Sequence, residues 1–247
     1  MLAPDAALEI FDEIDSTMEE ARRRAARGDF APVWLMARTQ TAGRGRRGRA
    51  WNSRAGNLMA TYYGVAKAPP ATLALLGFAA GVAIAEAVSD DAGETPVSLK
   101  WPNDVLMGGA KIAGLMLDTA AAPGGHWLAL GFGVNIAEAP EGLDQPTAAL
   151  AQTARAPPTP ESLLARIRAR LERWSMILAG QGFAPVREAW LARAHAPGAP
   201  LHVRAGSDLI AGRFAGLSAQ GELELATPDG VRRIAVGDIV AEAREAT

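Results

Sequence analysis

The stretch KWPNDVLMGGAKIAGL, residues 100–115, predicts a strand, a tight turn and a returning strand. Residues 97–107 read as a strand broken at Pro102, Gly108-Gly109 is a typical hairpin turn, and residues 111–119 form the return. Such a hairpin folds Lys111 back towards Asp104, so that a cation lies beside a carboxylate. A lysine there can neutralise charge that develops on a phosphate or carboxylate. The alternative is structural, with Trp101-Pro102 as core at a strand bend and Asn103-Asp104 as a turn.

Strands and helices alternate on the N-terminal side of this hairpin. Strands are expected over residues 7–14, 32–39 and 58–63. Ser16-Thr17-Met18-Glu19 predicts a capping box, in which the Ser16 hydroxyl accepts from the Glu19 amide, and the helix that follows ends near Gly28. Residues 70–90 are apolar on nearly every face, which is typical of a helix buried against a sheet. Because this segment contains glycines and a glutamate, we do not expect a membrane span.

The C-terminal side divides into a helical part and a part rich in short strands. A strand is expected at residues 126–134, a linker at 154–160, and helices at 161–178 and 183–194. In the first of these helices, Arg166, Arg170 and Arg173 are interpreted as a solvated face. Short strands follow at residues 201–205, 209–217, 222–226, 231–236 and 239–240. They predict a small β-barrel of SH3-like size.

The fold class is therefore α/β or α+β. We expect a mixed sheet of about seven strands backed by helices over residues 1–196, followed by the small barrel over residues 197–247.

Composition indicates a soluble enzyme. The 247 residues carry a formal net charge of −2, so no overall field attracts nucleic acid. No cysteine is present, which excludes disulfides and thiol chemistry, and the N-terminus shows no signal-peptide pattern. The 25 basic residues comprise 22 arginines and only three lysines, of which Lys100 and Lys111 belong to the hairpin. The three histidines belong to no motif, which disfavours a serine-histidine hydrolase or a histidine metal site.

A second segment, QTAGRGRRGRAW at residues 40–51, combines glycines with arginines. Glycines allow the backbone to approach a ligand, and guanidinium groups bind carboxylate and phosphate in pairs of hydrogen bonds. The segment is neither a P-loop nor a dinucleotide fingerprint. Alone it could equally be a disordered basic loop or a nucleic-acid patch. Together with the hairpin it predicts a site that binds a phosphate-bearing small molecule and closes a lid over it.

Four ordered motifs resemble those of the biotin protein ligases. They are residues 40–51, KWPND at 100–104, KIAGL at 111–115 and GFGVN at 131–135. Asp15-Ser16-Thr17 resembles the first biotin-binding segment of that family, and the strand-rich tail looks like its C-terminal domain. The resemblance implies the class II synthetase-like biotin/lipoate ligase fold. It also implies an ATP-dependent ligase that forms biotinyl-5′-adenylate with Mg²⁺ and biotinylates one lysine of a biotin carboxyl carrier protein.

The resemblance also implies roles for individual residues. Biotin would be bound by Ser16, Thr17, Gln40, Arg44, Gly45, Arg46, Trp51 and Lys111, with the first three at its ureido head and Trp51 along its tail. ATP and the adenylate would be bound by Arg44, Arg46, Arg49, Asn103, Lys111 and Asn135. Lys111, Arg46 and Asp104 would be catalytic. Asp104 would orient the acceptor lysine or lie near Mg²⁺, and no metal site made by the protein alone is expected.

The sequence departs from the family pattern at two positions: Met18 stands where Asn is usual, and Ala50 replaces a common basic residue. Since only six residues precede the first expected strand, we expect no DNA-binding domain, no nucleic-acid partner and no membrane partner. The alternatives are a lipoate or octanoate ligase of the same fold, a nucleic-acid-binding module that uses the Gly-Arg loop, and an inactive homologue. We expect a cytoplasmic monomer or homodimer.

Overall fold

The computed structural model describes residues 2–51, 54–143 and 145–240. The large sheet contains β1 (Ala7–Ile14), β2 (Val33–Gln40), β3 (Leu58–Ala66), β4 (Val97–Lys100), β5 (Asp104–Met107), β6 (Ala110–Ala122) and β7 (Gly125–Val134). The helices are α1 (Thr17–Ala26), α2 (Pro70–Ser89), α3 (Pro160–Gln181) and α4 (Phe183–Leu191). The second sheet contains β8 (Pro200–Ala205), β9 (Asp208–Leu217), β10 (Leu223–Thr227), β11 (Gly230–Ile234) and β12 (Asp238–Val240).

The seven-stranded sheet has the order β1-β2-β3-β7-β6-β5-β4. β1 runs parallel to β2, and every other neighbouring pair is antiparallel. The predicted mixed sheet is thus confirmed. The segment expected as one broken strand is two strands, because the chain turns at residues 101–103 and β5 pairs back on β4.

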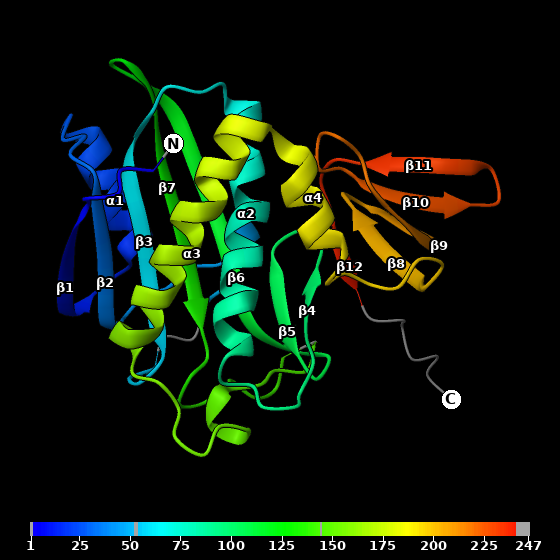
Figure 1. The fold of residues 1–247 in the computed structure, drawn as a ribbon, viewed down its shortest axis with the longest axis horizontal. Coiled ribbons are helices and arrows are strands. Elements are labelled where there is room, and N and C mark those ends of the chain that lie inside the picture. Colours follow the sequence, from blue (N-terminus) through cyan, green and yellow to red (C-terminus); the bar gives the residue numbers. More distant parts are fainter. Residues whose placement is uncertain (1, 52–53, 144, 241–247) are drawn as a thin grey trace.

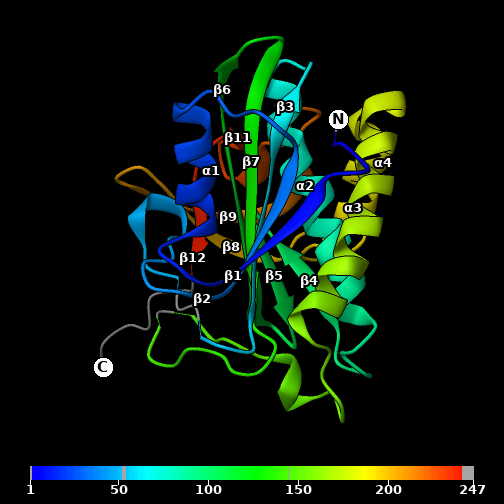
Figure 2. The same ribbon diagram turned by 90° about the vertical axis from the view of Figure 1, so that its left-hand side faces the viewer.

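The sheet lies between α1 on one face and α2 with α3 on the other (Figures 1 and 2). Successive residues of a strand point to opposite faces, so β3 and β7 divide their side chains between two cores. Tyr62 and Leu130 belong to the large core on the α2 side, whereas Tyr63 and Ala129 pack in the smaller core against α1. α2 is long and apolar enough to span a membrane, but 67% of its most apolar window is buried, which marks it as a core helix.

One local prediction is wrong and another is incomplete. Ser16 occupies the N-cap of α1 in extended geometry, but its side chain makes no capping hydrogen bond. Its amide binds the carboxylate of Asp15, and the carboxylate of Glu19 pairs with Arg22, so the capping box does not form. The arginines of α3 are also more than a solvated face. Arg173 pairs with Glu86 of α2, and Arg166 and Arg170 pair with Asp90 and Asp91, which directly follow α2, so that these pairs connect the two helices.

The C-terminal strands form a five-stranded antiparallel sheet in the order β11-β10-β9-β8-β12, where the sequence predicts a small barrel. This C-terminal sheet lies beside α4 and β4 (Figure 1). Its buried residues, including Val203 and Phe214, belong to the same apolar cluster as the α2 side of the large sheet. Trp101, which is 2% exposed, donates its indole hydrogen to the carbonyl oxygen of Gly221 at 3.1 Å. The turn between β4 and β5 is therefore built against the C-terminal sheet.

Candidate active site

Three glycines of β6 and β7 present backbone without side chains on the α1 face of the large sheet, next to the N-terminus of α1. Gly114 of β6 lies directly opposite Gly133 of β7, and Gly131 lies between Thr61 of β3 and Met116 of β6. Residues 131 and 133 share a face because strand side chains alternate. We call Gly114, Gly131 and Gly133 the glycine floor.

The side chains of Met18, Trp51 and Lys111 lie directly on this floor. A Cβ atom on Gly133 would stand 2.4 Å from the Trp51 ring, and one on Gly131 would stand 2.5 Å from the sulfur of Met18. A Cβ atom on Gly114 would stand 3.1 Å from Cε of Lys111. Larger residues would therefore displace the groups that surround the floor, which explains why these positions are glycine.

Hydrogen-bonding groups gather at the α1 end of the floor. The backbone amide of Thr17 donates to Oε1 of Gln40 at 2.8 Å, and the Thr17 hydroxyl donates to the same oxygen at 3.2 Å. The Thr61 hydroxyl donates in turn to the Thr17 hydroxyl at 2.8 Å. Ser16 and Thr17 are both buried. The structure thus brings Gln40 to Ser16 and Thr17, predicted site residues that lie more than twenty positions earlier in the sequence.

Asp15 fixes the segment that leads into α1. Its carboxylate receives two hydrogen bonds from Arg23, at 2.7 and 2.8 Å, and one from the Ser16 amide. The hydrogen bond from Arg23 is the main reason that the pKa of Asp15 falls to about 2. The carboxylate is therefore ionised near neutral pH, and it anchors the start of the helix at the edge of the site.

A buried carboxylate between two lysines borders the other end of the floor. Nζ of Lys111 lies 2.7 Å from one oxygen of Asp104, and Nζ of Lys100 lies 3.3 Å from the other. Lys100 also donates to Gln145 at 2.6 Å, and the ammonium of Lys111 lies 5.6 Å from the centre of the Trp51 ring. The predicted approach of Lys111 to Asp104 across the hairpin is confirmed. Two cations in so small a volume favour an anionic ligand.

The Gly-Arg loop is folded back on itself. The Gly45 amide donates to the carbonyl oxygen of Arg49 at 2.7 Å, and the Trp51 amide donates to that of Gly43 at 2.9 Å. The turn in between requires positive φ at Arg47 (57°) and at Gly48 (72°). Residues 44 and 50 form an antiparallel bridge.

Arg46 is the arginine of this loop that reaches the hairpin. Its guanidinium donates to Oδ1 of Asn103 at 2.9 Å and to the carboxylate of Asp238 at 3.0 Å. Burial lowers the pKa of Arg46, and Asp238 opposes that shift. Arg46 thus links the loop, the turn before β5 and the C-terminal sheet.

The two predicted nucleotide-binding asparagines are both engaged with the backbone. Nδ2 of Asn103 donates to the carbonyl oxygen of Leu115 at 2.7 Å, which leaves its oxygen facing Arg46. Asn135 is buried, and its Nδ2 donates to the carbonyl oxygen of Ala148 at 3.0 Å. That bond holds the segment whose neighbours, Pro146 and Ala148, pair with the backbone of Lys111.

Several residues of the site were not identified as such from the sequence. The role of the glycine floor could have been found from Gly131-x-Gly133, because glycines two apart in a strand expose one face of a sheet. Thr61 and Asp238 carry no comparable signal, since each reaches the site through pairing that is remote in sequence.

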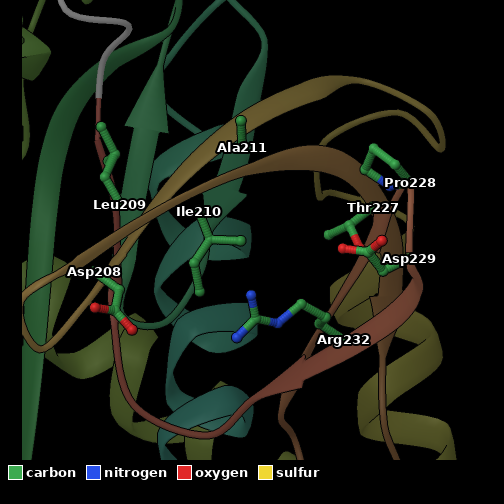
Figure 3. Close-up of a pocket in the computed structure, with 8 residues that line it drawn as sticks. All are labelled: Asp208, Leu209, Ile210, Ala211, Thr227, Pro228, Asp229 and Arg232. Carbon is green, nitrogen blue, oxygen red and sulfur yellow. The ribbon is translucent and has the colours of Figure 1, made fainter.

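A separate hollow of about 420 Å³ lies on the C-terminal sheet (Figure 3). Its polar lining includes Asp208, Asp229 and Arg232. None of its lining residues belongs to the predicted motifs, so the glycine floor and its surroundings remain the candidate site.

Comparison with known proteins agrees with this geometry. Residues 16–135 match the Biotin/lipoate A/B protein ligase family. The chain is 37% identical over 233 residues to a biotin–[acetyl-CoA-carboxylase] ligase of Paracoccus denitrificans, with 91% of this chain and 96% of the relative covered. It is 35% identical over 170 residues to the enzyme of the same name from Mycobacterium tuberculosis, with 67% of this chain and 62% of the relative covered.

A solved structure extends the likeness to the fold. The biotin protein ligase of Aquifex aeolicus, in complex with biotin and ATP, matches with a TM-score of 0.78 and 26% identity. The match covers 94% of this chain and 97% of the other. The sequence identity over nearly the full length of the Paracoccus relative, joined with this agreement in fold, shows that the chain belongs to the biotin protein ligase family.

Proposed function

We propose that this enzyme joins biotin to a lysine of a biotin carboxyl carrier domain in two steps. A carboxylate oxygen of biotin attacks the α-phosphorus of ATP, which forms biotinyl-5′-adenylate and releases pyrophosphate. The acceptor amine then attacks the acyl carbon, which forms the amide and releases AMP. The observation that carries this proposal is the glycine floor, with hydrogen-bonding groups at one end and the Lys100–Asp104–Lys111 cluster at the other.

Biotin would lie along the floor, with its ureido head towards α1. Ser16, Thr17 and Gln40 would bind the head, because hydroxyl and amide groups suit a urea that both donates and accepts hydrogen bonds. The tail would lie against the Trp51 ring. Since each floor position already contacts a side chain, those side chains would limit the space that is open to biotin above the floor.

Adenylate formation would be assisted by cations arranged around the carboxylate end. Lys111 would stabilise negative charge where the biotin carboxylate meets the α-phosphate. Arg44, Gly45 and Arg46 would close over the same junction, and Arg49 would reach the phosphate from the exposed side of the loop. Asn103 and Asn135 would border the nucleotide, the latter chiefly by holding the segment beside Lys111.

Asp104 would orient the incoming acceptor lysine. Its carboxylate lies beside Lys111 at the end of the floor, where it can accept a hydrogen bond from the incoming amine. Its pairing with Lys100 and Lys111 makes it a poor ligand for Mg²⁺, and the described residues hold no cluster of three metal-ligating side chains. Mg²⁺ would therefore arrive bound to the phosphates of ATP, where it neutralises their charge.

The loop would also protect the intermediate. An acyl-adenylate is a mixed anhydride that water hydrolyses readily, so solvent must be excluded until the carrier protein arrives. A glycine-rich segment can close over the ligand and open again for the acceptor. We place this chemistry in the cytoplasm, with the carrier protein as the only macromolecular substrate.

The relatives named for biotin favour biotin over lipoate or octanoate as the acyl substrate. The nucleic-acid alternative is disfavoured by the overall charge, since the chain carries a formal net charge of −2.

ATP–pyrophosphate exchange with Mg²⁺ tests the proposal. Exchange that depends on biotin and not on lipoate is expected. Exchange with lipoate alone would move the chain to the lipoate branch, and the absence of exchange with either acid would overturn the adenylating function.

A further inference from the structure

One carboxylate of the C-terminal sheet meets three arginines of the Gly-Arg loop. Asp238 begins β12, and its oxygens lie 3.0 Å from Arg46, 3.4 Å from Arg47 and 3.0 Å from Arg49. The carbonyl oxygen of Gly237 accepts a further, longer hydrogen bond from Arg46 at 3.5 Å. The loop is therefore tied to a strand that lies about 190 residues further along the chain.

Asp238 differs from an ordinary surface ion-pair partner. Its side chain is only 17% exposed, and its pair with Arg46 is screened from solvent on both sides. Exposed ion pairs with a single partner contribute little to stability. A shared and partly buried carboxylate, in contrast, holds several groups in one arrangement. The contact thus has the geometry of a fixed anchor.

The anchor itself rests on the catalytic part of the chain. The carbonyl oxygen of Ile239, the next residue, accepts from Lys100 at 3.4 Å, and Gly237 lies close to the ring of Trp101. Asp238 is therefore held by the same KWPND turn that presents Asp104. Since Arg46 bonds Asn103 and Asp238 through the same nitrogen, the position of this arginine depends on both partners.

The charges do not cancel in this cluster. Three guanidinium groups surround Asp238 and two ammonium groups flank Asp104, so that five cations face two carboxylates. The anchored loop consequently keeps unbalanced positive charge beside the floor, ready for an anionic ligand.

We propose that Asp238 is a positioning residue of the ligase reaction: it holds the Gly-Arg loop against the C-terminal sheet so that Arg46 stays beside Asn103 of the hairpin. The proposal rests on the proposed function for its reaction consequence, but the anchoring itself does not depend on the substrate. Without Asp238 the loop would open more often, and the adenylate would escape more readily.

The anchor is tested first without substrate, by limited trypsin digestion of the full-length protein. The variant is Asp238→Asn. The matched control is Glu224→Gln, which alters a carboxylate of the same sheet that pairs with Arg233 and does not touch the loop. Cleavage after Arg46, Arg47 and Arg49 is followed by mass spectrometry. We expect about tenfold faster cleavage at these sites in Asp238→Asn, and wild-type rates in the control.

Two further variants separate anchoring from general destabilisation. Asp238→Glu keeps the charge and is expected to slow cleavage back towards the wild-type rate. Arg49→Gln removes one pair from the loop side, at a residue that is 63% exposed, and is expected to speed cleavage after Arg46 and Arg47. Unchanged cleavage in Asp238→Asn, or equal acceleration along the whole chain without rescue by Asp238→Glu, would overturn the anchor.

The reaction consequence is tested with biotin, ATP and Mg²⁺ in the absence of carrier protein. We expect Asp238→Asn to release about tenfold more biotinyl-adenylate into solution per adenylate formed than the Glu224→Gln control. Faster cleavage with unchanged release would overturn the positioning role. Failure of the wild-type protein to form adenylate would overturn the proposed function, while the substrate-free digestion would still report on the anchor.

Discussion

Gly133 shows how a missing side chain makes room for a neighbouring ring. In the structure the Trp51 ring occupies the space that a Cβ atom at this position would need, at 2.4 Å. Such a separation is too short for any real contact, so the ring or the sheet must move. The backbone of β7 is ordinary strand at this position, so its conformation does not require glycine. Glycine is required here because of the ring that packs on it.

Gly133→Ala is expected to weaken biotin binding by at least about tenfold, because the displaced Trp51 ring narrows the cleft. Calorimetric titration with biotin alone measures the effect. Gly180→Ala is the control, since Gly180 of α3 has no neighbour within 4 Å of an added Cβ and the helix gains from alanine. Equal biotin affinity in Gly133→Ala and the control would show that biotin does not lie on this floor.

We propose that Lys111 acts on charge that appears during the reaction. Its ammonium contacts Asp104 at 2.7 Å and lies near Trp51, at the end of the floor opposite Thr17. A cation at that end stabilises the forming adenylate more than it stabilises bound biotin.

Lys111→Ala is therefore expected to slow adenylate formation by about a hundredfold or more and to weaken biotin binding much less. Single-turnover kinetics measure the rate of adenylate formation, and titration with biotin measures the affinity. Lys67→Ala, which changes the lysine outside the hairpin, is the control. Equal losses in rate and in affinity would assign Lys111 a purely binding role.

The hairpin between β5 and β6 illustrates what a sequence pattern can and cannot predict. Gly108-Gly109 correctly predicts the turn, and the turn brings Lys111 to Asp104. The register contains an irregularity between Val105 and Leu106, which places Gly114 opposite Asp104. The local sequence does not predict that shift in register, because the shift depends on how β6 pairs with β7.

Remote contacts account for most of what was missed. Patterns of two and 3.6 residues predict strands and helices well, since each reports the local burial of a segment. The Ser16 cap failed because Arg22 and Asp15 offered competing partners. The contact between Arg46 and Asp238 spans 192 residues, so only the assembled fold reveals it.

The junction of α2 and α3 depends on ion pairs around one glutamate. Glu86 is 18% exposed and accepts hydrogen bonds from Arg173 and from the indole of Trp174, with Arg170 and Arg193 at 3.9 Å. Hydrogen bonds to a partly buried charge contribute more to the free energy of unfolding than exposed ion pairs do.

Glu86→Gln is expected to lower the free energy of unfolding by about 1–2 kcal/mol, because several arginines lose their shared anion. Glu9→Gln, which affects a 45% exposed partner of Arg24, should change it by less than about 0.5 kcal/mol. Urea unfolding at neutral pH compares the two variants. A larger loss for Glu9→Gln than for Glu86→Gln would contradict this account of the junction.

The two sheets share one apolar cluster, so the catalytic part and the C-terminal sheet depend on each other for stability. Residues of the C-terminal sheet such as Val203 and Phe214 belong to the same cluster as Trp101 and Leu99. Arg187 of α4 adds a hydrogen bond to the carbonyl oxygen of Leu217 at 2.6 Å. Loss of packing at this boundary is therefore expected to destabilise both sheets.

His195 lies at this boundary, between α4 and β8. Its ring centre is 6.0 Å from that of Phe214, and its Nε2 atom is buried without a hydrogen-bond partner. Burial, with a smaller contribution from Lys100, lowers the pKa of His195 below its ordinary value of 6.5. The unfolded chain therefore takes up a proton at a higher pH than the folded chain does.

It follows that the stability linked to His195 is fully present above about pH 6.5 and is lost as the pH falls from there towards the lower pKa of the folded state. We expect His195→Leu to flatten this loss between pH 8 and pH 5, and to leave the protein at least as stable at pH 8, because an unpaired buried nitrogen is removed. The urea midpoint across that pH range measures both effects. His202→Gln, in the adjacent strand, should retain the wild-type slope, and the same slope in His195→Leu would mean that another group controls the acid sensitivity of the boundary.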